Sequence, residues 1–157
     1  MITLVLVRHA KAAPADALHP DDARPLSVEG REQAGRTGEA LRGLICGDVQ
    51  IACSPKPRAR ETAEIIGAAL GSAALPQPRE FLSGGHDPDE ILGALETHDA
   101  NALILVGHEP DMGRLLARLL DPAGRASIPF SSAGYAIVQI DALPPRREGK
   151  LKAFGSP

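Results

Sequence analysis

The sequence is poor in aromatic residues, with no Trp, one Tyr and three Phe among 157 residues. The core must therefore be built mainly from Leu, Ile, Val and Ala, and a surface that stacks single-stranded nucleic acid is disfavoured. The net charge is −3 and no basic block occurs, so the electrostatic signature of a general nucleic-acid binder is also missing. The length fits one core, and we expect a single domain over residues 1–157.

Cysteine is equally scarce, because only Cys46 and Cys53 occur and their spacing does not match a metal site. We expect two reduced, largely buried thiols rather than a disulfide or a redox centre. No apolar stretch approaches the roughly 20 residues that span a bilayer, and no charged segment precedes the first apolar run. These absences predict a soluble, cytoplasmic protein that binds neither membranes nor nucleic acid.

Apolar runs of strand type alternate along the chain with amphipathic segments of helix type. Three of the strand segments are continuous apolar runs, which is typical of strands buried on both faces. The alternation predicts an α/β protein with a mostly parallel sheet covered by helices on both faces. We expect strands at residues 2–7, 49–53, 102–106, 135–140 and 151–154, with a weaker one at Phe81-Leu82.

Capping residues predict where the helices begin. Ser27 is the expected N-cap of a helix that runs to about Arg42. The segment Asp87-Pro88-Asp89-Glu90 places a cap, an N1 proline and an N3 glutamate at the start of a helix that we expect to end near Thr97. We expect further helices at residues 57–70 and from Pro110 to before Pro122, and loops at residues 12–25 and 71–78.

Polar and basic residues follow three of the predicted strands. Arg8 and His9 end the first strand, Ser54 and then Arg58 follow the second, and His108 follows the third. A lone histidine after a strand more often makes a structural hydrogen bond, so it is the convergence that indicates a function. Ligands of such sheets gather at the carboxyl ends of the strands, where helix N-termini also offer unpaired N–H groups. The pattern predicts a concave, cationic site suited to a phosphate dianion.

Three sequence blocks resemble those of a known family. Residues 6–10, Leu-Val-Arg-His-Ala, resemble the Arg-His-Gly/Ala signature of the histidine phosphatase (phosphoglycerate mutase-like) superfamily. Residues 54–63 resemble its Ser-x-x-x-Arg-Ala-x-x-Thr-Ala block, and residues 106–110 its Gly-His block. The short length and Arg24-Pro25-Leu26 are similar to the small SixA-type phosphohistidine phosphatases.

The resemblance implies a three-layer α/β/α fold, no metal or other cofactor, and a phosphohistidine intermediate. It implies that His9 is the nucleophile, attacking through a neutral Nε2 while a backbone carbonyl holds its Nδ1–H. Arg8 and Arg58 would hold the equatorial phosphoryl oxygens. His108 would be a further donor, protonated when a dianion is bound.

Other polar residues are weaker candidates. Glu80 lies where larger family members carry a general acid, but the fuller acid motif is missing and an exposed carboxylate is the favoured interpretation. Arg24 and Lys11 are loop cations at the rim of the site or simply solvated, and His86 is expected in solvent beside the capping Asp87. No role is expected for Arg114 and Arg118, on one polar helix face, or for His19 and His98, which lack metal-ligand spacing.

We therefore expect a metal-independent phosphatase that removes phosphate from phosphohistidine on a protein. Short loops would leave the site open to a protein surface, and a phosphoramidate needs an acid less than an ester does. Two alternatives stay open: a small-molecule phosphomonoesterase of the same superfamily, and a non-catalytic module that binds phosphate or a phosphoprotein. The oligomeric state is not predicted.

Overall fold

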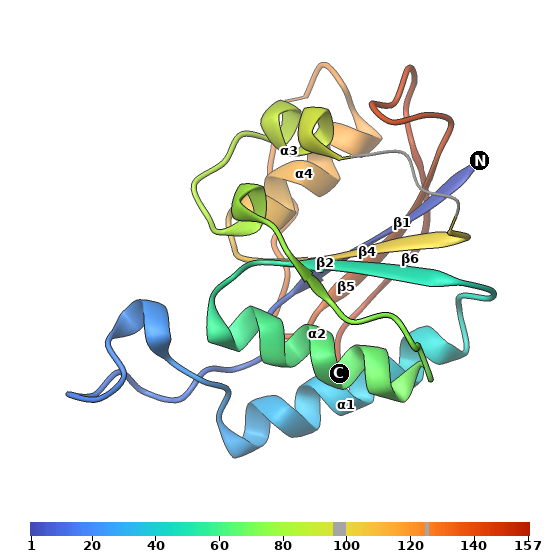
Figure 1. The fold of residues 1–157 in the computed structure, drawn as a ribbon. Helices are drawn as coiled ribbons and strands as arrows, with labels where there is room; N and C mark the ends of the chain where they lie inside the picture. Colours follow the sequence, from blue (N-terminus) through green and yellow to red (C-terminus); the bar gives the residue numbers. More distant parts are fainter. Residues whose placement is uncertain (96–99, 125) are drawn as a thin grey trace.

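The computed structural model describes residues 1–95, 100–124 and 126–157, which build a sheet of six strands in the order β3-β2-β4-β1-β5-β6 (Figure 1). Strand β5 runs antiparallel to both of its neighbours, and the other pairings are parallel. All the described strands except β5 therefore point the same way, so the predicted mostly parallel sheet is confirmed. The strands are β1 (Ile2–Arg8), β2 (Val49–Cys53), β3 (Gln77–Pro78), β4 (Ala102–Gly107), β5 (Tyr135–Ile140) and β6 (Lys150–Gly155).

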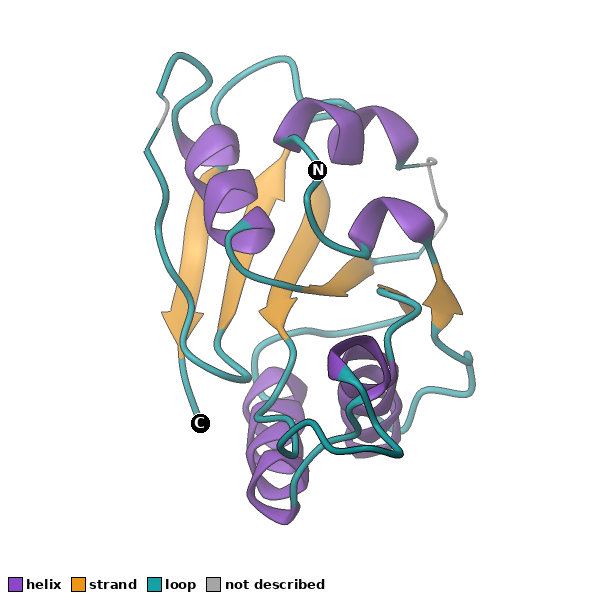
Figure 2. Cartoon of the chain, turned by 90° about the vertical axis from the view of Figure 1, so that its left-hand side faces the viewer, coloured by secondary structure: helices purple, strands orange, loops and turns teal. Residues whose placement is uncertain are grey.

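Helices cover both faces of the sheet, as Figure 2 shows. Alternate residues of β1 point to opposite faces, so Leu4 and Leu6 join one apolar cluster and Val5 and Val7 join the other. The first cluster packs under α3 (Pro88–Ala94) and α4 (Asp111–Leu120), and the second under α1 (Val28–Arg42) and α2 (Pro57–Ala69). The predicted three-layer α/β/α architecture is confirmed.

Local signals set the starts of two helices as expected. The Ser27 hydroxyl accepts a 3.0 Å hydrogen bond from the Gly30 N–H at the start of α1. The Asp87 carboxylate accepts one of 2.9 Å from the Asp89 N–H at the start of α3. Helix α3 ends at Ala94, and the end predicted near Thr97 lies outside the described residues.

Two segments differ from the sequence predictions. The strand predicted at Phe81-Leu82 is wrong, because Glu80–Leu82 forms a short 3-10 helix, η2, that buries Leu82 among core residues. Pairing with β2 instead falls on Gln77–Pro78, inside the predicted loop 71–78. The ladder ends with the hydrogen bond from the Arg79 N–H to the Cys53 carbonyl, because the chain then turns into η2 at Glu80. The loop 12–25 also contains a 3-10 helix, η1 (Asp21–Ala23).

Of the two cysteines, only Cys53 is buried as expected. Both thiols are free, and Cys53 is buried at the end of β2. Cys46 is exposed, contrary to the expected burial, because it lies in the turn after α1 rather than on the strand that follows. No described helix is both long enough and apolar enough to cross a membrane.

The sheet order brings three strand ends together. Strand β4 lies between β1 and β2, and Arg8 is in register with Gly107. The ladder continues one residue past the strands, because the His9 N–H donates to the Gly107 carbonyl and the Ser54 N–H donates to the Val106 carbonyl. The residues that leave β1, β2 and β4 are therefore neighbours at one edge of the sheet.

Candidate active site

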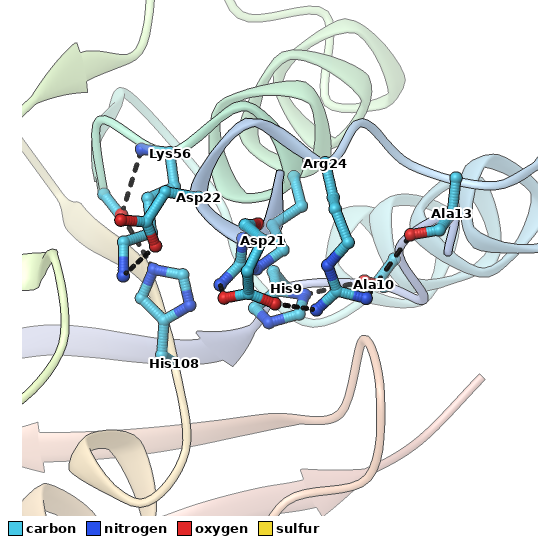
Figure 3. Close-up of polar contacts among 10 residues, drawn as sticks. His9, Ala10, Ala13, Asp21, Asp22, Arg24, Lys56 and His108 are labelled. Carbon is cyan, nitrogen blue, oxygen red and sulfur yellow. Dashed lines mark hydrogen bonds and ion pairs between the residues drawn. The ribbon is translucent and has the colours of Figure 1, made fainter. Parts of the chain in front are cut away.

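Two histidine rings lie side by side at this edge. His9 follows β1 and His108 follows β4, with ring centroids 5.0 Å apart and an edge-on arrangement (Figure 3). The His9 Nδ1 lies 2.7 Å from the Ala10 carbonyl oxygen. A carbonyl can only accept, so in the neutral ring Nδ1 carries the proton and Nε2 carries a free lone pair.

The surroundings keep both rings neutral near pH 7. Burial lowers the pKa of His9 to about 4, and the positive charges of Arg58, Arg8 and Arg24 act in the same direction against the raising effect of the Ala10 carbonyl. Burial also lowers the pKa of His108 to about 3, followed by the effects of His9 and Arg58. The expected opposition of the arginines to protonation of His9 is present, although burial is the larger cause.

Backbone carbonyls from distant parts of the chain hold two arginines. Arg8 Nη1 donates to the Phe130 carbonyl at 2.9 Å, and Arg58 Nη1 donates to the Asp21 carbonyl at 2.8 Å. The Nε–H of each guanidinium is buried and has no partner among the described residues. An unpaired buried donor is costly, so these N–H groups are suited to an anion held at the site.

Ser54 supports His108 from the end of β2. The His108 Nε2 lies 2.8 Å from the Ser54 hydroxyl oxygen, and that oxygen accepts a 3.2 Å hydrogen bond from the Lys56 N–H. Ser54 is fully buried, so the contact fixes the ring where solvent cannot compete. The sequence placed Ser54 at a strand end without assigning it a role, and its position one residue after β2 was the available signal.

The short helix η1 brings acidic residues to the site that the sequence analysis did not single out. Asp21 Oδ1 lies 3.1 Å from Arg24 Nη2, and Asp21 Oδ2 lies 3.8 Å from Arg58 Nη2. Asp22 Oδ1 lies 3.4 Å from Lys56 Nζ. The spacing of Asp21 and Arg24, three residues apart in a loop with three prolines, was the only sequence signal of this arrangement.

Arg24 is brought to the site, as its predicted rim position requires. It contributes to the lowered pKa of His9 and donates from Nη1 to the Ala13 carbonyl at 3.3 Å. Lys11 is not directed to the site, because its ammonium lies 2.6 Å from the Glu29 carboxylate on exposed surface. The side chain of Glu80 is exposed at the start of η2, and no hydrogen bond or ion pair links it to the other described residues.

The loop after η2 forms another part of the rim. A Cβ placed on Gly84 would lie 3.9 Å from both the His108 ring and the Lys56 ammonium. The buried Asp111 holds this loop, because its carboxylate accepts from the Gly85 and His86 N–H groups. The His86 ring itself turns to Glu90, with Nδ1 3.1 Å from Oε2.

The remaining candidates form no ion pair with the site among the described residues. Arg118 pairs with Asp89 and His19 pairs with Asp16, whereas His98 lies outside the described residues.

Metal ligands are not clustered in the part of the chain that the structure describes. No group of three or more His, Cys, Asp or Glu side chains there could hold a metal ion. The charged side chains that act on His9 are the cations Arg8, Arg24 and Arg58, which suit an oxyanion rather than a divalent cation.

Comparison with known proteins identifies the family of this chain. The model of the histidine phosphatase superfamily (branch 1) matches residues 4–82, and the chain belongs to this superfamily. An uncharacterized protein from Picosynechococcus sp. strain PCC 7002 is 38% identical in an alignment of 118 residues that covers 70% of this chain and 68% of that protein.

Solved structures of SixA proteins share the whole fold. A SixA protein from Nakamurella multipartitia is 30% identical, with a TM-score of 0.78 over 99% of this chain and 95% of that one. The protein histidine phosphatase SixA complexed with tungstate has a TM-score of 0.81 at 23% identity, over 98% of this chain and 96% of that one. The resemblance to the phosphoglycerate mutase-like fold and to SixA proteins is thereby confirmed.

Proposed function

We propose that this chain is a metal-independent phosphatase that works through a phosphohistidine intermediate on His9. The observation that carries the proposal is the state of His9, which is neutral, fixed by the Ala10 carbonyl through Nδ1, and free at Nε2. In the first step a bond forms between Nε2 and phosphorus while the bond from phosphorus to the leaving group breaks. Water then attacks the phosphorylated His9, giving inorganic phosphate and the free histidine.

Arg8 and Arg58 are proposed to hold the equatorial phosphoryl oxygens, where negative charge spreads in the transition state. Their anchoring carbonyls set the direction of each guanidinium before the substrate arrives, so little ordering is needed in the reaction. His108 is proposed to become a donor, because a dianion beside it would raise its lowered pKa. Its contact with Ser54 engages Nε2 and leaves Nδ1 available.

The proposed substrate is phosphohistidine on a protein. Glu80, the candidate general acid, is exposed, and its side chain has no hydrogen bond or ion pair with the site among the described residues. An alkoxide leaving group needs such an acid, whereas an imidazole leaves as a neutral molecule when its other nitrogen is protonated. The similarity to SixA proteins supports the same substrate class.

Turnover of different leaving groups tests this proposal. Phosphohistidine in a protein or peptide should exceed alkyl phosphates in kcat/KM by about 10²–10⁴-fold, the usual value of general acid catalysis, with aryl phosphates between them. Glu80→Gln should change phosphohistidine turnover by less than about tenfold. If alkyl phosphates are the best substrates and Glu80→Gln abolishes their hydrolysis, the chain is a small-molecule phosphomonoesterase. Binding of phosphate without turnover of any substrate would indicate a non-catalytic module.

A further inference from the structure

Two carboxylates lie at the mouth of a site whose other charged groups are mostly cations. A negative charge beside a phosphate site opposes substrate binding, so the presence of each carboxylate needs an explanation. Asp21 positions the arginines, because its side chain bridges Arg24 and Arg58 and its backbone carbonyl accepts a hydrogen bond from Arg58. Asp22 forms no ion pair with either arginine among the described residues, so its presence needs another explanation.

Asp22 lies on the solvent-exposed side of His108. Its carboxylate is 79% exposed, and Figure 3 draws it beside His108 with a contact to Lys56. Its charge reaches His108, whose pKa it raises against the larger effects of burial and of the cations. Arg58, 7% exposed with an unpartnered Nε–H, lies on the inner side. The phosphoryl group would thus lie against the arginine and the histidines, and the departing group on the side of Asp22.

We propose that Asp22 makes the site selective for phosphoramidates whose leaving group is a protonated nitrogen base, above all phosphohistidine. This inference rests on the proposed phosphatase function and adds the residue that sets its substrate class. The carboxylate accepts the N–H of the substrate imidazolium at the ring nitrogen that does not bear phosphorus. It thereby favours the reactive, protonated form of the phosphohistidine in the complex.

The step balances without a proton from the enzyme. The bond from His9 Nε2 to phosphorus forms, the bond from phosphorus to the substrate nitrogen breaks, and its electron pair goes to that nitrogen. The proton already on the other ring nitrogen stays there, held by Asp22, and the leaving group is neutral imidazole. An ester leaves instead as an oxyanion, which Asp22 repels.

Lys56 limits the cost of this carboxylate for phosphate binding. Its ammonium lies 3.4 Å from Asp22 and close to Gly84 on the opposite rim, so the pair presents little net charge to an incoming dianion. The charged and titratable groups around Asp22 are then Lys56 at the N-cap of α2, His108 after β4, and Asp21 and Arg58 on its inner side.

The test compares Asp22→Asn with wild type on a phosphohistidine peptide and on p-nitrophenyl phosphate. The ratio of kcat/KM for the peptide to that for the ester should fall about tenfold, with hydrolysis of the ester raised because repulsion is relieved. The pH above which peptide turnover declines should move down by about one unit, since a tenfold effect corresponds to one pKa unit. Asp16→Asn is the matched control, because its carboxylate bonds within its own turn, and it should leave the ratio unchanged.

The test separates a failure of the role proposed for Asp22 from a failure of the proposed substrate class. If wild type prefers the phosphohistidine peptide but Asp22→Asn keeps both the ratio and the pH profile, the role of Asp22 is wrong and the proposed function stands. An equal loss on both substrates also overturns the inference, because it indicates a structural role of Asp22. If wild type does not prefer the peptide at all, the proposed substrate class itself is wrong.

Discussion

At the scale of single residues, His9 combines a neutral ring with a fixed ring orientation. It is neutral near pH 7 because it is buried beside arginines, and its orientation is set by the Ala10 carbonyl. Each property alone is common in structural histidines. Together they leave one lone pair directed away from the backbone in a pocket of donors, which is what a nucleophile for phosphorus requires.

Replacement of His9 should remove activity without unfolding the protein. The only described hydrogen bond of its side chain is to the adjacent residue, so His9→Ala breaks no long-range hydrogen bond and removes only the edge-on contact with the His108 ring. We expect turnover to be abolished and the circular dichroism spectrum and melting temperature to stay close to wild type. An acid-labile phosphoryl label trapped on wild type should be absent from the variant. Label that persists on His9→Ala would rule out His9 as the nucleophile.

The lowered pKa values of His9 and His108 can be measured directly. Because both folded-state values lie well below the ordinary 6.5, at about 4 and about 3, both rings should stay neutral as pH falls from 8 to 5. NMR titration of the ring Cε1–H signals should show no midpoint above about 5 in the native protein. In denaturant the same signals should titrate near 6.5, and a native midpoint there would contradict the burial argument.

At the scale of elements, the site depends on how α1 packs against the chain after β1. Gly30 lies in the first turn of α1, where a Cβ would lie 2.0 Å from the Lys11 carbonyl oxygen. The Ser27 N–H also donates to that carbonyl, so the helix start is tied to the segment that follows His9. This contact helps to place the loop that carries η1 beside the strand ends.

Two glycines of α1 should therefore respond oppositely to alanine. Gly30→Ala should destabilise the protein by about 3 kcal/mol, the upper part of the range for overpacked sites, because backbone must move. At Gly35 a Cβ would meet nothing within 4 Å, so Gly35→Ala should stabilise by about 0.5–1 kcal/mol through helix propensity. Urea denaturation measures both changes. Equal effects at the two positions would show that close packing on Lys11 does not matter.

At the scale of the whole molecule, burying neutral histidines makes the stability depend on pH. Between pH 6.5 and about 4, the unfolded chain binds protons at His9 and His108 that the folded chain does not bind. Stability therefore rises with pH across this window and is lost as pH falls through it. The melting temperature of wild type should be lower at pH 5 than at pH 7. His108→Gln should reduce this difference, and an unchanged difference would count against His108 as a source.

Chelation tests the mechanism of the whole protein. The described residues offer no cluster of three metal-binding side chains, and cations surround His9. Activity should therefore survive exhaustive treatment with EDTA. A loss that Mg²⁺ or Zn²⁺ restores would contradict a mechanism in which Arg8, Arg58 and His108 neutralise the phosphoryl group without a metal ion.

Much of the fold and the centre of the candidate site followed from local sequence. The apolar run before Arg8, the Ser27 cap and the Asp87-Pro88 start each act within a few residues, so their physics is visible without tertiary contacts. The grouping of Arg8, His9, Arg58 and His108 needed only one further step, because parallel strands of an α/β sheet end at a common edge.

Tertiary structure decided what depends on partners far away in the chain. The Phe81-Leu82 segment is apolar like a strand, but packing of Leu82 in the core made it a 3-10 helix. Lys11 and Arg24 are both loop cations, yet Glu29 binds the first on the surface while Asp21 and the Ala13 carbonyl hold the second at the site. Sequence by itself determines the residues that leave the strands. The fold alone decides which charges of a long loop return to them, because such contacts follow from the path of the backbone and not from local spacing.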